Sequence, residues 1–146
     1  GKAAFDTIQL PYGQQILWPT HCVMETSGAA LVPGLDIPHA GLILRKGSHS
    51  SIDSYSGLLE ADRAAPTGLA GYLRERSITH LYICGLAFDF CVRWTAEDAA
   101  QAGFGVCVVE DACRAIDLQG SSAKARAAMQ TAGVKLAKSQ DILRSY

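Results

Sequence analysis

The chain has 146 residues, of which 49% are hydrophobic and 18% charged, so we expect one globular domain over residues 1–146. The net charge of −1 and the lack of a basic stripe argue against a nucleic-acid partner. No apolar run reaches membrane-spanning length and no signal peptide is visible, so we expect a cytoplasmic protein without a membrane partner. The five cysteines form no Cys-x-x-Cys pair, which favours reduced thiols.

The first 40 residues predict little regular structure. Residues 1–22 contain turn signals with proline and glycine, and residues 23–40 are broken into a loop by further glycines and prolines. Residues 18–22 bring an aromatic ring, a rigid turn, an imidazole and a thiol together. His21 is either a structurally satisfied histidine or a metal ligand, and the adjacent Cys22 would not easily chelate the same ion.

Residues 40–45 form a short apolar run that predicts a strand, and Lys46 follows at its carboxyl end. Lys46 is either a functional ammonium or, as is usual for lysine, a solvated one. Residues 48–57 are rich in serine and predict a loop, and long loops at the carboxyl edge of a sheet tend to carry function. A helix is expected over residues 67–76.

The central stretch predicts a buried strand at residues 81–84, a turn at 85–91, and a helix over 92–100 that ends at Gly103. Cys91 would then lie where a parallel strand turns into a helix. Ligands bind at this edge of open α/β sheets, and a helix N-terminus stabilises a thiolate. The alternative is a buried cysteine that packs as a small hydrophobic residue.

The remaining chain predicts a strand at residues 105–110, a loop at 111–117, a helix at 123–131 capped by Ser121 or Ser122, and a last strand at 134–137. Strands that alternate with helices indicate parallel βαβ units and therefore an α/β fold. Asp111 could cap a helix, bond to backbone or line a site, and we favour capping or backbone bonding.

The strand ends after Leu44, Leu86 and Glu110 should meet along one edge of the sheet, which would bring Lys46 and Cys91 together. A lysine ammonium beside a thiol favours thiolate and can hold a developing anion. Backbone N–H groups at the turn could form an oxyanion hole. This equipment suits acyl transfer through a thioester, although no general base is obviously placed nearby.

These residues also resemble a known family. The string Gly85-Leu86-Ala87-Phe88-Asp89-Phe90-Cys91-Val92, followed by residues 95–99, resembles the signature of isochorismatase-like cysteine hydrolases. Residues 18–22, 45–47 and 52–56 narrow the resemblance to the nicotinamidase/pyrazinamidase branch. The resemblance covers nearly the whole chain and implies a three-layer α/β/α fold with a mainly parallel, Rossmann-like sheet.

The resemblance implies hydrolysis of nicotinamide, a small-molecule substrate, to nicotinate and ammonia, and of pyrazinamide as well. Cys91 matches the family nucleophile and Lys46 its catalytic lysine. Ala87 matches the residue after a cis peptide bond at Leu86–Ala87, and its N–H, together with that of Cys91, would form the oxyanion hole.

The resemblance also implies substrate and metal contacts. Trp18 and Tyr55 match aromatic walls around the pyridine ring, and Leu86 and Phe88 are expected beside the substrate. His21 matches a ligand of a divalent metal, zinc or iron, whose other ligands would lie in an N-terminal part of the domain. The assembly could be a homo-oligomer.

Two departures from the family pattern set further expectations. Phe88 stands where many members have threonine. The family's first, central strand, with its catalytic aspartate and the later Asp-x-His pair, has no match, so we expect that residues 1–146 lack an N-terminal segment needed to complete the sheet and the activity. Another amide or carbamoyl hydrolase of the superfamily, or a non-catalytic ligand-binding remnant, remains an alternative.

Overall fold

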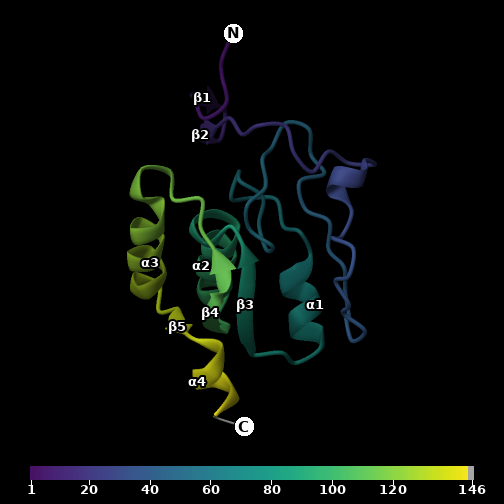
Figure 1. Ribbon diagram of the computed structural model, residues 1–146, viewed down its shortest axis with the longest axis vertical. Helices are drawn as coiled ribbons and strands as arrows, with labels where there is room; N and C mark the ends of the chain where they lie inside the picture. Colours follow the sequence, from purple (N-terminus) through teal and green to yellow (C-terminus); the bar gives the residue numbers. More distant parts are fainter. Residues whose placement is uncertain (145–146) are drawn as a thin grey trace. The chain divides into compact units, whose positions relative to one another are not determined.

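The computed structural model of the protein describes residues 1–144. Contacts within the chain divide it into two compact units, Gly1–Ile43 and Leu44–Tyr146, and each is described by itself (Figure 1). None of the described helices combines the length and the apolar character needed to cross a membrane.

The first unit contains a β-hairpin where we expected irregular chain. Strand β1 (Thr7–Leu10) pairs antiparallel with β2 (Gly13–Ile16), and only Pro11 and Tyr12 connect them. Proline presets a turn conformation, and Gly13 adopts a φ of +135° that other residues rarely take. The expectation for residues 1–22 was wrong here because the turn signals belong to a tight hairpin whose flanking strands are short and weakly patterned.

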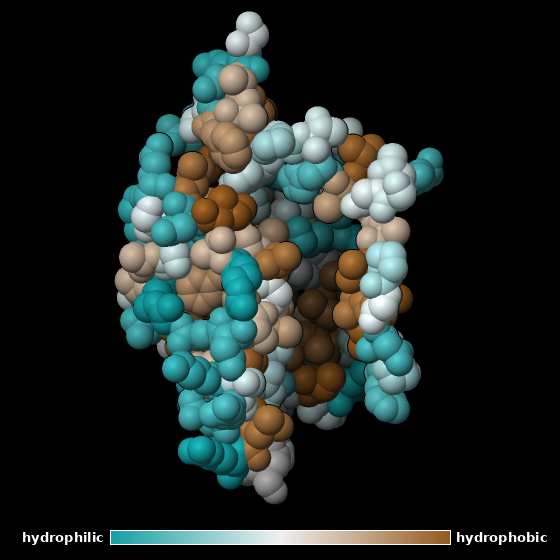
Figure 2. Space-filling model, viewed as in Figure 1, coloured by the Kyte–Doolittle hydropathy of each residue, from teal (hydrophilic) through white to brown (hydrophobic). Residues whose placement is uncertain are grey.

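After the hairpin the first unit is a loop, as predicted, apart from one 3₁₀ turn, η1 (Ser27–Ala29). This loop is rich in exposed apolar side chains, several of which are visible as brown groups in Figure 2. They are Val23, Met24, Leu31, Val32, Leu35, Ile37, Leu42 and Ile43.

The strand predicted at residues 40–45 is wrong, because the structure has no regular element there. Leu42 and Ile43 are 43% and 61% exposed, so this apolar run is not packed into a sheet. A strand requires a partner for its N–H and C=O groups, and hydrophobicity alone does not supply one.

The second unit is built on a parallel sheet of three strands in the order β3-β4-β5 (Figure 1). The strands are β3 (His80–Leu86), β4 (Gly105–Arg114) and β5 (Lys135–Ala137). The pairing of β3 with β4 shifts register between Ile83 and Gly85 and then continues to the end of both strands. The predicted loop was therefore wrong for residues 111–114, because a bulged strand keeps pairing where its sequence no longer shows a strand pattern.

Helices alternate with these strands, as the predicted βαβ pattern requires. They are α1 (Leu69–Glu75), the π-helical turn η2 (Phe88–Val92), α2 (Arg93–Gln101), the 3₁₀ turn η3 (Leu118–Gly120), α3 (Ser121–Thr131) and α4 (Ser139–Leu143). Helix α3 begins earlier than predicted, and its N-cap is Gly120 rather than Ser121 or Ser122. Asp111 accepts hydrogen bonds from the backbone N–H and the hydroxyl of Ser139 at the start of α4, at 2.8 and 2.6 Å, so the expected backbone bonding is confirmed.

One face of the sheet carries the hydrophobic core. Inward-facing residues of β3 and β4 pack against small side chains of α2 and α3, several of which are fully buried. The cluster includes Val106 and Val108 from β4 and Ala96, Ala99, Ala125 and Met129 from the helices, and the partly buried Leu81 and Ile83 of β3 pack against it. This packing fixes the beginning of α2, and with it the turn that carries Cys91.

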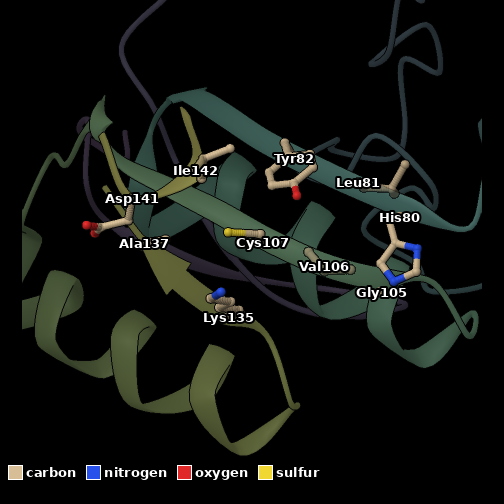
Figure 3. A pocket seen from close by; sticks show the side chains of 10 residues that line it. All are labelled: His80, Leu81, Tyr82, Gly105, Val106, Cys107, Lys135, Ala137, Asp141 and Ile142. Carbon is tan, nitrogen blue, oxygen red and sulfur yellow. The ribbon is translucent and has the colours of Figure 1, made fainter. Parts of the chain in front are cut away.

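The opposite face of the sheet bears a hollow of about 310 Å³. Tyr82, Cys107 and Lys135 lie opposite one another on three adjacent strands and line this hollow, with Asp141 and Ile142 of α4 at its border (Figure 3). Neither Lys46 nor Cys91 lines it. The hollow is therefore distinct from the predicted active site at the carboxyl edge.

Candidate active site

Cys91 lies in the π-helical turn η2, directly between strand β3 and helix α2. The peptide bond Leu86–Ala87 before this turn is cis, as the resemblance implies. Phe88 and Val92 of the same turn are buried in the core, whereas Cys91 is only half-buried. The core thus anchors the turn and leaves the thiol accessible at the carboxyl end of β3.

Lys46 contacts this thiol from an irregular segment. Its Nζ lies 3.7 Å from Cys91 Sγ and donates a hydrogen bond of 2.8 Å to the carbonyl oxygen of Ser54. The carbonyl holds the ammonium in place, close enough for its positive charge to act on the sulfur. The two residues therefore come together as expected, even though no strand at residues 40–45 brings Lys46 there.

The ring of Tyr55 packs against the nucleophile turn and the first turn of α2. Its centroid lies 6.2 Å from that of Phe90 and 5.4 Å from that of Trp94. The guanidinium of Arg63 lies over the Trp94 ring, 5.0 Å from its centroid. Arg63 also forms a bidentate ion pair with the buried Asp98. Tyr55 is thus held by rings on the element that carries Cys91.

Two backbone N–H groups near Cys91 already donate hydrogen bonds within the turn. The N–H groups of Phe90 and Val92 both donate to the carbonyl oxygen of Ala87, at 3.1 Å each. They are therefore not directed at a substrate. The N–H groups of Ala87 and Cys91, which the resemblance implies as the oxyanion donors, make neither of these two bonds.

Asp89, two positions before Cys91, has a structural task. Its carboxylate is 2% exposed and accepts hydrogen bonds from Ile116 N, Asp117 N and Ser121 Oγ, at 3.0, 2.8 and 2.5 Å. Burial works to raise the pKa of Asp89, but these hydrogen bonds together outweigh it and hold the pKa below its usual range. Asp89 thus fastens the nucleophile turn to the start of α3 rather than serving as the missing base.

The two flanking residues expected near substrate differ in exposure. Leu86 is 72% exposed at the edge of the sheet. Phe88 is 5% exposed within the core, with the guanidinium of Arg126 5.4 Å from its ring. The departure from the threonine of many family members is thus accommodated in the core packing.

Trp18 and His21 belong to the first unit. The Trp18 ring packs edge-to-face on Phe5, with centroids 6.0 Å apart. His21 is exposed, and its Nδ1 lies 2.7 Å from the carbonyl oxygen of Pro19. Because a carbonyl only accepts, Nδ1 carries the proton, and Nε2 keeps the lone pair that a metal ligand needs.

A metal needs more than this imidazole. Among the residues that the structure describes, no group of three or more His, Cys, Asp or Glu side chains could hold an ion. Zinc sites in proteins use at least three protein ligands. The described residues therefore supply one suitably oriented ligand but not a metal centre.

Four residues of the site escaped the sequence analysis. The Ser54 carbonyl that holds Lys46 is a backbone group and leaves no signal in the sequence. Phe90 and Trp94 are four residues apart, so helical spacing could have placed both on the face that Tyr55 contacts. Thr95, four residues after Cys91, could have been recognised as a hydroxyl able to bond back to the preceding turn.

Comparison with known proteins agrees with this geometry. The family model of the isochorismatase domain matches residues 7–141. The chain belongs to the isochorismatase family. This match gives no support to the expectation that an N-terminal part of the domain is missing.

Several of the curated relatives are nicotinamidases. That of Acinetobacter baylyi is 57% identical over 143 residues, which cover 98% of this chain and 67% of the relative. That of Escherichia coli is 39% identical over 123 residues, which cover 84% of this chain and 58% of the relative. The chain thus spans 58% to 67% of the length of these two isochorismatase-family enzymes.

Solved structures show the same relationship. A nicotinamidase/pyrazinamidase of Acinetobacter baumannii matches with a TM-score of 0.96 and 53% identity, over 97% of this chain and 69% of the other. PnC1 of L. infantum in complex with nicotinate matches with a TM-score of 0.80 and 41% identity, over 84% of this chain and 61% of the other. A pyrazinamidase of Pyrococcus horikoshii in complex with zinc matches with a TM-score of 0.70 and 34% identity, over 83% of this chain and 63% of the other. These matches confirm the predicted isochorismatase-like α/β fold and the nicotinamidase/pyrazinamidase branch.

Proposed function

We propose that the protein hydrolyses nicotinamide to nicotinate and ammonia through a thioester on Cys91, and that it also accepts pyrazinamide. The observation that carries the proposal is the approach of Lys46 Nζ to within 3.7 Å of Cys91 Sγ at a strand-to-helix turn. The identity of 57% to a nicotinamidase supports this choice of substrate.

In the proposed reaction the Cys91 sulfur attacks the carboxamide carbon, and the carbonyl oxygen becomes an oxyanion. The N–H groups of Ala87 and Cys91 hold this oxyanion, and the Lys46 ammonium stabilises the thiolate before attack. The proton lost by the Cys91 thiol passes to the departing nitrogen, so that the C–N bond breaks and ammonia leaves. Water then adds to the thioester carbon, the C–S bond breaks, and a proton from the water returns to the sulfur as nicotinate is released. The hydrogen-bonded, buried Asp89 takes no part in these proton transfers.

The ring of the substrate is proposed to lie against aromatic side chains. Tyr55 is one of them, packed on Phe90 and Trp94. The exposed Leu86 is proposed to border the ring, and Trp18 is proposed as an aromatic contact on the strength of the family resemblance alone. Phe88 contributes through the packing of the turn.

His21 is proposed as one ligand of a divalent metal, zinc or iron. The support is its Nδ1–H bond to Pro19, which leaves Nε2 available, and the zinc in the related pyrazinamidase structure. Because the described residues supply one such ligand, no reaction step is assigned to the metal. Replacing His21 with alanine should lower the metal content of the purified protein, measured by elemental analysis.

The test is ammonia and nicotinate release from nicotinamide by the protein, followed by enzymatic ammonia assay and chromatography. We expect turnover by the wild-type protein, and acylation of Cys91 visible by mass spectrometry after rapid acid quench. The Cys91→Ser variant should lack turnover.

The same assay separates the alternatives. Ammonia release from other amides or carbamoyl compounds, with nicotinamide untouched, would show a different hydrolase of the superfamily. Nicotinamide binding by calorimetry without ammonia release would show a ligand-binding remnant. Either outcome would overturn the proposed function.

A further inference from the structure

The segment that carries Tyr55 and the element that carries Cys91 are joined by one hydroxyl group. Thr95 Oγ1 donates a hydrogen bond of 2.6 Å to the carbonyl oxygen of Cys91. Thr95 Oγ1 also accepts a hydrogen bond of 2.9 Å from the backbone N–H of Gly57. A hydroxyl has one proton and two lone pairs, so both bonds are satisfied at once.

The second bond matters because of what else is attached to residues 54–57. The carbonyl of Ser54 holds the Lys46 ammonium, and the ring of Tyr55 packs on Phe90 and Trp94. A displacement of this segment along α2 would therefore move Lys46 away from the sulfur and tilt the aromatic wall together. Only Thr95 among these contacts bonds directly to the backbone of Cys91 itself.

Gly57 packs against Leu69 and Thr95 and is bonded through both of its backbone polar groups. A Cβ on Gly57 would lie 3.4 Å from a Leu69 methyl and 3.5 Å from the Thr95 methyl. The carbonyl of Gly57 in turn accepts a hydrogen bond of 2.5 Å from Thr67 Oγ1. Both polar backbone groups of Gly57 are thus fixed by threonine hydroxyls, and Thr95 provides the one that leads to the nucleophile.

The geometry points to Thr95 as a positioning residue for amide hydrolysis: its hydroxyl sets the distance between the Lys46–Tyr55 segment and Cys91. This inference rests on the proposed function. Thr95 itself touches neither the reacting sulfur nor, in this role, the substrate. Small misplacements of catalytic groups are costly, since a shift of about 1 Å can reduce the rate about a hundredfold.

The experiment compares Thr95→Val, which keeps the shape but removes the hydroxyl, with Thr95→Ser, which keeps the hydroxyl. Thr131→Val is the matched control, because Thr131 Oγ1 also donates to a carbonyl four residues back, that of Ala127, but on the exposed surface of α3. We expect Thr95→Val to lower kcat/KM for nicotinamide about tenfold, the effect of one lost hydrogen bond that positions reacting groups. Both kcat and KM should change, because Lys46 and Tyr55 move together.

Thr95→Ser should recover most of this loss, and Thr131→Val should leave both constants unchanged. A destabilising effect alone would reduce the amount of folded enzyme and hence kcat, but it would leave KM unchanged. Melting temperatures are measured for all variants so that assays are run on folded protein. A Thr95→Val variant with unchanged kcat/KM, or with loss in kcat alone, would overturn the inference.

A second measurement does not depend on nicotinamide. The rate of iodoacetamide labelling at Cys91, divided by the rate at the exposed Cys22, should fall in Thr95→Val, because the Lys46 ammonium is no longer held against the sulfur. If the wild-type protein failed to hydrolyse nicotinamide, the proposed function would be wrong. The labelling ratio would still show whether Thr95 positions Lys46 beside Cys91. An unchanged ratio would overturn the positioning role.

Discussion

The second unit contains two pairs of cysteine and lysine, and they differ in their place on the sheet. Cys91 and Lys46 meet at the carboxyl end of β3, with the thiol half-buried and 3.7 Å from the ammonium. Cys107 lies within β4 near its beginning, directly opposite Lys135 on β5, and is 8% exposed. Burial raises the pKa of the Cys107 thiol, and the charge of Lys135 lowers it by less.

The difference shows what a neighbouring lysine can and cannot do. For a thiol buried within a strand of the sheet, the loss of water around the sulfur outweighs an adjacent charge, so the thiol stays protonated. At a strand-to-helix turn the sulfur keeps access to solvent and substrate, and the ammonium can act on it. Position in the fold, more than the presence of lysine, separates the two thiols.

The largest expected effect comes from removing each sulfur. Cys91→Ala should reduce nicotinamide turnover at least about 10⁴-fold, since loss of a nucleophile removes the covalent route. Cys107→Ala should change kcat/KM by less than about threefold. Steady-state assays of both purified variants test this, and a comparable loss in both would end the distinction between the two sites.

Removing each ammonium should have a smaller effect. Lys46→Met should lower kcat about 10²- to 10³-fold, the usual cost of losing a charged group that stabilises the reacting anion. Lys135→Met is the matched control and should remain near wild type, because Lys135 lines the hollow on the other face of the sheet. If Lys46→Met retained full activity, the proposed role of the 3.7 Å contact would be wrong.

Alkylation should separate the thiols by about tenfold or more at neutral pH, because the thiolate is the reactive form. Iodoacetamide labelling with peptide mass mapping should modify Cys91 well before Cys107 and Cys113, which are buried and have raised pKa values. Because a raised pKa means less thiolate at a given pH, labelling of these two should grow only as the pH exceeds the usual thiol range. Faster labelling of Cys107 than of Cys91 would contradict the comparison.

The anchoring of the Cys91 turn gives the smallest effect. Asp89→Asn should lower the free energy of unfolding by about 1–3 kcal/mol, because buried donors lose a charged acceptor. The exposed Asp111, which also accepts bonds from a backbone N–H and a serine hydroxyl, gives the control Asp111→Asn with a smaller loss. Urea unfolding monitored by circular dichroism measures both, and equal losses would argue against a special role for the turn.

The pH dependence of stability tests the same anchor. The pKa of Asp89 is lowered in the folded protein, so its contribution is complete above the usual carboxyl range near about pH 4. It is lost as the pH falls through the lowered folded pKa. Asp89→Asn should therefore flatten part of the loss of stability between about pH 4 and more acidic conditions.

Local sequence patterns predicted the elements at the centre of the second unit correctly but not those at its edges. The strand before Cys91 and the helix after it were predicted because apolar runs and helix formers there agree with the tertiary packing. The continuation of β4 to Arg114 depends on a register shift with β3, and the loss of a strand at residues 40–45 depends on a missing partner. Both depend on pairing between residues far apart in the chain, which a short stretch of sequence does not show.

The site divides in the same way. Cys91, Lys46 and the cis peptide bond after Leu86 were expected from motifs, and the structure brings the first two together. The contacts that hold them, from the Ser54 carbonyl and Thr95, come from segments about 40 residues apart in the chain and became visible only with the fold. Motifs identify reactive groups, whereas their supports are distributed through the chain.

The burial of three residues in the Cys91 turn has a consequence for how the enzyme can change over evolutionary time. Phe88, Asp89 and Val92 tie the nucleophile to the hydrophobic interior, while the half-buried Tyr55 belongs to a segment joined to it by the Gly57–Thr95 hydrogen bond and by ring contacts. Substitutions of the Tyr55 side chain can therefore reshape the ring-binding wall while the backbone of residues 54–57 keeps its bonds to Lys46 and Thr95, whereas changes beneath the thiol would unfold the protein first. A scaffold of this kind allows related proteins to change the amides that they bind while they keep the same cysteine-based hydrolysis.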